Sequence, residues 1–294
     1  MARLRLKRLC VVLLLAVSAF YSAVVLLNCR ENRAVRLLFG VGPDSSASIE
    51  AFGVFHFVWL GVCILAAVAV GISAWRYATE HLTDRLVFCF GIAFFLLEWY
   101  KQLAYGLAND SGAYSYSVFP FQFCSLPMYI CLTAPMLGPR AKHTCYCFLA
   151  LFGTVGGYLV MAYPNFPPSS IFCVHTMLWH TLMILLGAWL LVGTPCGKSF
   201  VRDFLPAAGV FLAVFAIAMV LNVLLYDRSG GKINLFYMSP YHKTNYYIIG
   251  DAQRIWGWGA SVVVYLLLFL FAGAMPIWIF GAVLERIRLK KRKN

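Results

Sequence analysis

The first long apolar run of the chain, residues 9–27, reads LCVVLLLAVSAFYSAVVLL and contains no charged residue. A helix rises about 1.5 Å per residue and the hydrocarbon layer of a membrane is about 30 Å thick, so about 20 apolar residues make one crossing. Comparable runs follow at 51–74, 86–105, 116–137, 144–162, 171–193, 204–225 and 258–284. The sequence therefore predicts an all-α, polytopic transmembrane helix bundle with about eight spans.

Composition excludes a soluble globular domain. Of the 294 residues, 62% are hydrophobic and 12% are charged, and the mean hydropathy is +0.79. Soluble domains carry about 25% charged residues. The net charge of +13 does not indicate a nucleic-acid partner, because the basic residues gather at the ends of the predicted spans. Their placement is typical of membrane topology.

The basic residues also predict the orientation of the spans. Sixteen Lys and Arg residues lie in the two termini and in the loops after the second, fourth and sixth spans, whereas the opposite loops hold seven. Positive charge favours the cytoplasmic side, so we expect a multi-pass protein of the cell membrane with both termini in the cytoplasm. The basic start and the AVSA of residues 16–19 resemble a cleaved signal peptide. However, the apolar run continues to Leu27, which favours an uncleaved first span.

The ten cysteines include no CxxC pair and no regular spacing. This pattern indicates neither a disulfide framework nor a zinc site, and we expect no metal and no cofactor. The longest outer loop, residues 226–257, is rich in Tyr and Trp, which suit the membrane interface. It is a candidate lid or interfacial segment.

Polar side chains within the predicted spans are the strongest functional signal, because ionisable groups in a membrane are costly and often mark a site. They are His56, Glu98, Lys101, Gln102, Gln122, Cys124, His175, His180 and Asn222. At the helical rise, Cys124 and His180 both lie about 12–14 Å below the outer boundary. The outer halves of the spans are therefore predicted to enclose one polar chamber.

Some of these residues have a structural interpretation that the sequence leaves open. Glu98 and Lys101 are three residues apart, so they can form an ion pair that only helps the span cross the membrane. An interfacial histidine such as His175 can hydrogen-bond a backbone carbonyl or a lipid headgroup. Cys124 lies between Pro120 and Pro127, which loosen a helix locally and favour a cavity wall. It can equally be an inert buried thiol beside a proline kink.

Five motifs resemble a known family. They are FGVFHFVWL (52–60), LLEWYKQ (96–102), FPFQFCSLPMYI (119–130), HTMLWHTLMI (175–184) and TNYYIIGD (244–251). Together they resemble the YwaF-type bacterial membrane proteins, which look like the prokaryotic branch of animal proteins that move acyl chains onto ether lysophospholipids. The resemblance begins at residue 51. It divides the chain into an N-terminal anchor span with its outer loop (1–50) and a seven-span domain (51–294).

The resemblance implies thioester chemistry without a cofactor, with membrane phospholipids and lysophospholipids as partners. Cys124 is the expected nucleophile and His180 the expected general base. Gln122 departs from the family pattern, which has a histidine two residues before the cysteine, and glutamine cannot act as a base. The residues expected to bind substrate are Gln122, His56, Glu98, Lys101, His175, Asn222 and Asn245.

Two other classes of function stay open from the sequence. Acids and histidines within spans also line transport routes. The inner halves of the predicted spans lack such residues, and we find no inverted repeat, which argues against a transporter. A non-catalytic lipid-binding protein is the third class, and the departure at Gln122 favours it.

Overall fold

The computed structural model describes residues 2–41, 49–109, 113–167, 169–244 and 246–293, and of residues 2–3 and 280–293 it describes the backbone alone. The elements in these ranges are α1 (Ala2–Asn28), α2 (Arg33–Leu38), α3 (Val54–Tyr77), α4 (Glu80–Ala108), η2 (Tyr116–Val118), η3 (Phe123–Ser125), α5 (Leu126–Thr133), η4 (Ala134–Met136), α6 (Pro139–Phe148), η5 (Leu149–Gly153), α7 (Thr154–Ala162), α8 (Ser170–Gly193), η6 (Phe200–Phe204), α9 (Leu205–Leu224), η7 (Leu235–Tyr237), α10 (Tyr247–Trp256) and α11 (Trp258–Lys293). The predicted all-α class is confirmed.

The described residues contain six helices long and apolar enough to cross a membrane. They are Leu4–Asn28, Val54–Tyr77, Pro139–Ala162, Ser170–Gly193, Phe200–Leu224 and Trp258–Ile279. Helix α4 is long enough as well but carries several charges, and Phe123–Met136 is a shorter apolar helix. These eight segments match the predicted spans in order, so the span count agrees roughly with the prediction.

The fourth predicted span, 116–137, is not one continuous helix. After a 3-10 turn at Tyr116–Val118 the backbone is extended through Gln122, and helical structure resumes only at Phe123. Pro120 explains the break, because proline disfavours helix in the residue before it. Pro127 then lies at the start of α5, where a missing N–H costs nothing. Residues 123–136 rise about 21 Å, which is less than the thickness of the hydrocarbon layer.

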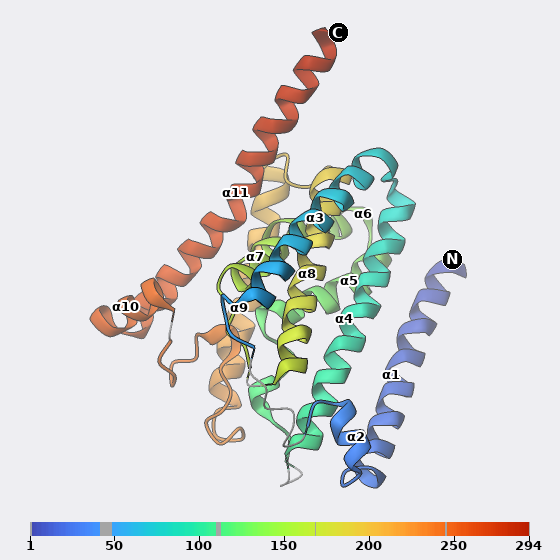
Figure 1. Cartoon of the computed structure of the whole chain (residues 1–294). Helices are drawn as coiled ribbons and strands as arrows, with labels where there is room; N and C mark the ends of the chain where they lie inside the picture. Colours follow the sequence, from blue (N-terminus) through green and yellow to red (C-terminus); the bar gives the residue numbers. More distant parts are fainter. Residues whose placement is uncertain (1, 42–48, 110–112, 168, 245, 294) are drawn as a thin grey trace.

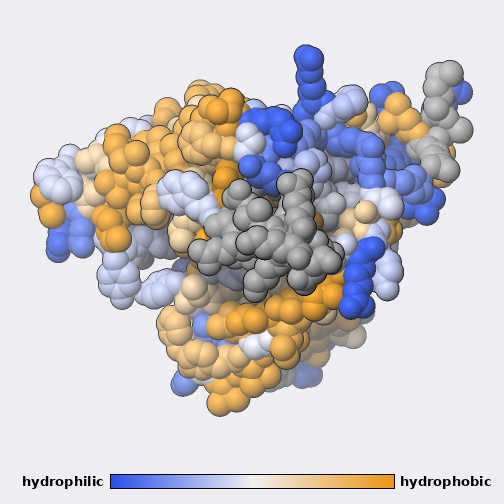
Figure 2. Space-filling view, turned by 90° about the horizontal axis from the view of Figure 1, so that it is seen from above, coloured by the Kyte–Doolittle hydropathy of each residue, from blue (hydrophilic) through white to orange (hydrophobic). Residues whose placement is uncertain are grey.

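The helices alternate in direction, so the N-terminal end of α1 and the C-terminal end of α11 lie at the same end of the bundle (Figure 1). Helix α8 is central and packs against α3, α7 and α4. Helix α1 lies at the edge and touches α4, where Trp99 donates hydrogen bonds to Ser22 Oγ (2.9 Å) and to the Ser18 carbonyl (3.2 Å). Seen along the bundle, hydrophobic residues occupy much of the perimeter, as lipid contact requires (Figure 2).

Close packing of α7 on α8 depends on small residues. A Cβ atom built on Gly187 of α8 would lie 1.7 Å from Thr154 Oγ1 and 2.8 Å from Thr154 Cβ. A Cβ on Gly157 of α7 would lie 3.0 Å from the carbonyl oxygen of His180. Small residues let helix backbones approach in this way in membranes. The contact fixes the position of His180 relative to α7.

We predict that Gly187→Ala lowers the thermal unfolding midpoint of the purified protein. Thr154 cannot swing aside without losing the hydrogen bond from its hydroxyl to the Ala150 carbonyl (2.6 Å), and overpacking of this kind costs about 1–3 kcal/mol. Gly209→Ala is the matched control, because a Cβ on Gly209 meets nothing within 4 Å. An equal loss of stability in both variants would contradict the packing argument.

Candidate functional site

Cys124 lies in the first turn of the helical segment that begins at Phe123. Cys124 is half-buried, and its carbonyl accepts a hydrogen bond of 2.9 Å from Trp179 Nε1 of α8. The N–H of Ser125 donates to the Gln122 carbonyl (2.9 Å), which closes the turn. The break before Phe123 therefore places the thiol at the positive end of a helix dipole, inside the bundle.

His180 follows Trp179 directly and is buried at 6% exposure. Its Nδ1 lies 2.7 Å from the Thr176 carbonyl, which can only accept, so the neutral ring carries its proton on Nδ1. Nε2 is then an unprotonated nitrogen, and among the described residues this buried atom has no hydrogen-bond partner. No hydrogen bond joins His180 to Cys124 in the described structure. Trp179 links α8 to the cysteine segment instead.

The Glu98–Lys101 pair lies beside both residues. Lys101 Nζ is 2.8 Å from Glu98 Oε2, and Gln102 Nε2 donates to Glu98 Oε1 at 2.7 Å. The Lys101 ammonium also lies 5.8 Å from the centroid of the Trp179 ring. Trp179 also binds the Cys124 carbonyl, so it links the Glu98–Lys101 pair with the cysteine segment.

His175 and His56 each bond a backbone carbonyl of a neighbouring helix. His175 Nε2 donates to Leu97 of α4 (3.0 Å), and its ring lies 5.8 Å from that of Trp179, so it borders the cluster. His56 Nε2 donates to Met161 of α7 (2.7 Å), and its ring contacts belong to Phe52, Phe57 and Phe166. His56 therefore joins α3 to α7, and the contacts given for it do not reach Cys124. Asn245 lies outside the described residues.

Gln122 and Asn222 both hydrogen-bond backbone atoms of residues 234–236, which belong to the loop 234–240. Gln122 donates to the Asn234 carbonyl (2.9 Å) and accepts from the Phe236 N–H (2.8 Å). Asn222 donates to the Leu235 carbonyl (3.0 Å) and accepts from the Leu235 N–H (2.7 Å). Both amide groups are thus used by backbone. Their direct role is to position this loop beside the cysteine segment.

The loop held by these amides is strained and contributes a residue that the sequence interpretation did not assign to the site. Phe236 and Tyr237 both have φ of 56°, a left-handed conformation that residues other than glycine rarely adopt. Strain of this kind persists where surrounding contacts enforce it. Tyr237 is 50% exposed, and desolvation of its buried part raises the pKa of its phenol to about 12. The aromatic content of the outer loop was the only signal for Tyr237.

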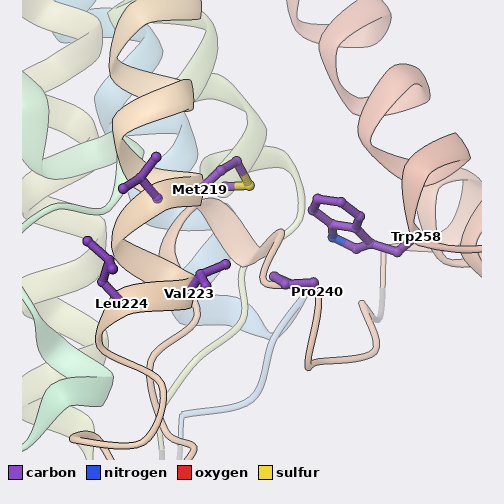
Figure 3. A pocket seen from close by; sticks show the side chains of 6 residues that line it. Met219, Val223, Leu224, Pro240 and Trp258 are labelled. Atoms are coloured by element: carbon purple, nitrogen blue, oxygen red, sulfur yellow. The ribbon is translucent and has the colours of Figure 1, made fainter.

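An open apolar groove of about 360 Å³ lies at the other end of this loop (Figure 3). It is lined by Met219, Val220, Val223, Leu224, Pro240 and Trp258. Trp258 Nε1 donates to the Met238 carbonyl (3.0 Å), which ties the groove to the loop. Residues 234–240 therefore connect the Cys124 segment with an apolar surface at the C-terminal end of α9.

A second group of reactive side chains lies apart from Cys124. His143 and Cys147 of α6 and Cys196 after α8 present ligand atoms that all lie within 4.8 Å of one another. The pKa of the Cys196 thiol is lowered to about 6, because Cys147 and His143 hydrogen-bond its sulfur. These residues could hold a metal ion. The sequence interpretation missed them, although His143 and Cys147 are spaced by four residues and so share a helix face.

The fold defines a polytopic helical membrane protein. A model of the TMEM164 family matches residues 51–280, well over half of the chain, and the chain belongs to the TMEM164 family. No curated protein and no solved structure matches the chain. The narrower resemblance to YwaF-type proteins and the division into 1–50 and 51–294 stay predictions, as do the cell membrane as location and the cytoplasmic side of the termini.

We predict that Glu98→Gln lowers the thermal unfolding midpoint, because the substitution leaves the Lys101 ammonium without its carboxylate. Removing one partner of a buried pair costs about 3–5 kcal/mol, whereas replacing both by neutral groups costs much less. The double variant Glu98→Gln/Lys101→Met should regain most of the loss. Asp251→Asn is the control, since its ion pair with Arg254 has the same i, i+3 spacing but is exposed. A stable Glu98→Gln single variant would contradict a structural role for the pair.

Proposed function

We propose that the protein transfers an acyl chain from a membrane phospholipid to a lysophospholipid through a thioester on Cys124. The observation that carries the proposal is the state of His180. Its Nδ1 is committed to the Thr176 carbonyl and its Nε2 is buried without a partner among the described residues, while the preceding residue, Trp179, binds the Cys124 carbonyl. An imidazole fixed in this tautomer is prepared to accept a proton on Nε2.

Acylation of the enzyme begins when His180 Nε2 takes the proton of the Cys124 thiol. The sulfur attacks the ester carbonyl of the phospholipid, and the carbonyl oxygen becomes an oxyanion. Collapse of this intermediate breaks the C–O ester bond, and the lysophospholipid leaves with the proton from His180. The N-terminal position of Cys124 on its helix and the nearby Lys101 ammonium both favour the negative charge of the thiolate and of the oxyanion.

Transfer completes the cycle at the same residues. The hydroxyl group of an acceptor lysophospholipid gives its proton to His180 Nε2 and attacks the thioester carbonyl, and the Cys124 sulfur leaves and regains a proton from His180. An ether lysolipid is an acceptor of this kind. Water in place of the acceptor gives hydrolysis. The apolar groove beside Pro240 and Trp258 suits an acyl chain, because its lining is almost entirely apolar.

Gln122 has a positioning role in this proposal. Its amide binds backbone atoms of Asn234 and Phe236 and so holds the strained loop that carries Tyr237. A base is not needed at this position, because His180 supplies the unprotonated nitrogen. The presence of glutamine where the resembling family has histidine is therefore compatible with the reaction. The Tyr237 phenol, near Cys124, can donate a hydrogen bond to the substrate headgroup or to the ester oxygen.

We predict that Cys124→Ala abolishes acyl transfer by the purified protein in detergent or liposomes. The assay supplies a phospholipid with a labelled acyl chain and an unlabelled ether lysophospholipid, and it follows label in the product lipid. Without acceptor, the native protein should acquire label that neutral hydroxylamine releases. Cys131→Ala, a buried cysteine of the same helix, should keep both activities. Full transfer by a folded Cys124→Ala protein would eliminate the nucleophile.

We predict that His180→Gln slows labelling of Cys124 by about 100-fold or more, the usual contribution of a general base. Glutamine keeps a polar side chain of similar length but offers no proton acceptor of suitable basicity. His81→Gln, at an exposed histidine of α4, should leave the rate unchanged. Labelling of His180→Gln at the native rate would show that another group takes the thiol proton. Lipid binding without any transfer in the native protein would favour the non-catalytic class.

A further inference from the structure

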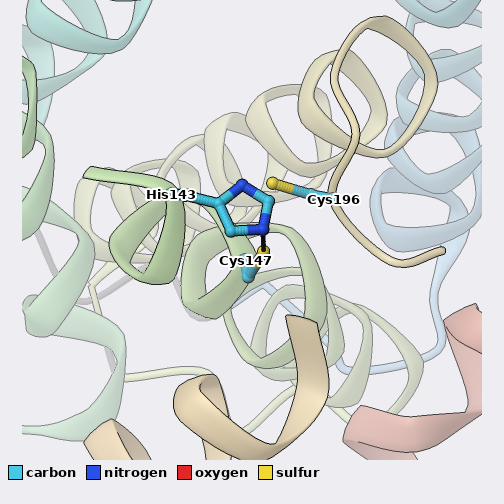
Figure 4. Close-up of side chains that lie close together, drawn as sticks. All are labelled: His143, Cys147 and Cys196. Carbon is cyan, nitrogen blue, oxygen red and sulfur yellow. Dashed lines mark hydrogen bonds between the residues drawn. The ribbon is translucent and has the colours of Figure 1, made fainter. Parts of the chain in front are cut away.

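Four side chains with metal-ligating chemistry converge away from Cys124. His143 and Cys147 lie one turn apart on α6, Cys196 lies in the connection between α8 and η6, and Asp203 lies in η6 (Figure 4 draws the first three). Asp203 is fully buried, and both cysteines are buried. The four residues come from two chain segments about 50 residues apart, so the fold brings them together.

The spacing of the donor atoms suits a tetrahedral ion. His143 Nε2 lies 3.4 Å from Cys147 Sγ and 2.9 Å from Asp203 Oδ1, and the ligand atoms of the two cysteines and the histidine all lie within 4.8 Å of one another. Tetrahedral zinc, with Zn–S of about 2.3 Å and Zn–N and Zn–O of about 2.0–2.1 Å, separates its ligand atoms by roughly 3.3–3.8 Å. For the histidine and the two cysteines, shifts of a few tenths of an ångström to about one ångström convert one arrangement into the other. Asp203 is placed by its 2.9 Å contact with His143 Nε2.

Cys147, His143 and Asp203 are not arranged as a catalytic relay. A relay uses both ring nitrogens, one toward the thiol and the other toward the carboxylate. Here Cys147 Sγ and Asp203 Oδ1 both face Nε2 of His143. A single nitrogen carries one proton or one lone pair, so it cannot satisfy two such partners fully. A cation placed among the three atoms would interact favourably with each of them.

We infer that His143, Cys147, Cys196 and Asp203 form a structural zinc site. Two thiolates and one imidazole are the donors that zinc prefers, and a carboxylate oxygen completes the tetrahedron. The other carboxylate oxygen, Oδ2, is held by the N–H groups of Lys198 (2.8 Å) and Ser199 (3.0 Å), which orients Oδ1 toward the histidine. Outer contacts of this type fix ligand geometry in metal sites. Oδ1 also accepts from Arg202 Nε (3.1 Å), a contact that zinc binding at this oxygen would replace or share.

A bound zinc ion would link two parts of the bundle that are far apart in sequence. The ligands on α6 belong to the span that continues into α7. The other two, Cys196 and Asp203, belong to the segment that connects α8 to α9. The predicted topology places this end of the bundle in the cytoplasm, where thiols stay reduced and available to a metal. Binding releases the thiol protons and adds its free energy to the stability of the fold.

The experiment measures metal in the full-length protein purified without chelator from cells grown with zinc. We expect about one zinc per chain by elemental analysis, and less than about a tenth of that in Cys147→Ser and Cys196→Ser. Cys145→Ser is the matched control, because Cys145 is on the same helix but outside the cluster and should leave the zinc content unchanged. Removal of zinc by a strong chelator should lower the thermal unfolding midpoint of the native protein and not that of Cys147→Ser.

A second readout keeps the test valid where a cysteine variant fails to fold. Native protein stripped of zinc and titrated with Co²⁺ should develop thiolate-to-cobalt charge-transfer absorption, and His143→Ala and Asp203→Asn should weaken Co²⁺ binding. Native protein with no zinc and no cobalt spectrum would overturn the site. A Cys147–Cys196 disulfide in freshly purified protein would also overturn it, and so would zinc retained by the Cys147→Ser/Cys196→Ser double variant.

Discussion

Residues 118–124 lie within the bundle without a continuous helix, and an unsatisfied backbone group in a membrane costs several kcal/mol. Side chains from three helices meet this constraint. Gln102 of α4 donates to the Val118 carbonyl (2.7 Å), Tyr129 of α5 to Pro120 (2.7 Å), and Trp179 of α8 to Cys124 (2.9 Å). Two of the same side chains belong to the polar cluster, because Gln102 donates to Glu98 and the Trp179 ring lies 5.8 Å from Lys101 Nζ. Satisfying the broken backbone and assembling the site are thus one structural requirement.

Much of the fold follows from local sequence. Apolar runs predicted the order and approximate position of the spans, because membrane thickness fixes the length of a span and each apolar run shows it directly. The polar cluster around Cys124 was also anticipated, since Glu98, Lys101 and His180 are costly in lipid and must find partners. The span predicted over 116–137 is continuously helical only from Phe123 onward. The two prolines predicted a local loosening of the helix. The hydrogen bonds from Tyr129 and Trp179 explain why the chain stays extended up to Gln122.

Contacts between residues that are far apart in the chain could not be predicted from the sequence. Gln122 and Asn222 looked like members of a binding chamber, yet both hold residues 234–236, and no local pattern links positions 122, 222 and 235. The same holds for His143, which lies on α6, and Cys196, which lies in the connection after α8. Spacing rules for metal sites describe ligands close in sequence. Here only the His143–Cys147 spacing is local, and half of the donor set comes from a turn that tertiary structure brings near.

Helix α8 connects the two sites. His180 and Gly193, where the helix ends, are 13 residues apart, which corresponds to about 20 Å along the axis, so the zinc ligands share no contact with the thiol. In the proposed arrangement the metal fixes the end of α8 to α6. A helix held at one end cannot slide along α7, and sliding by even one residue would separate Trp179 from the Cys124 carbonyl. The glycine contacts set the distance between α7 and α8 but not their register along the helix axis. A metal that holds the end of α8 would set that register.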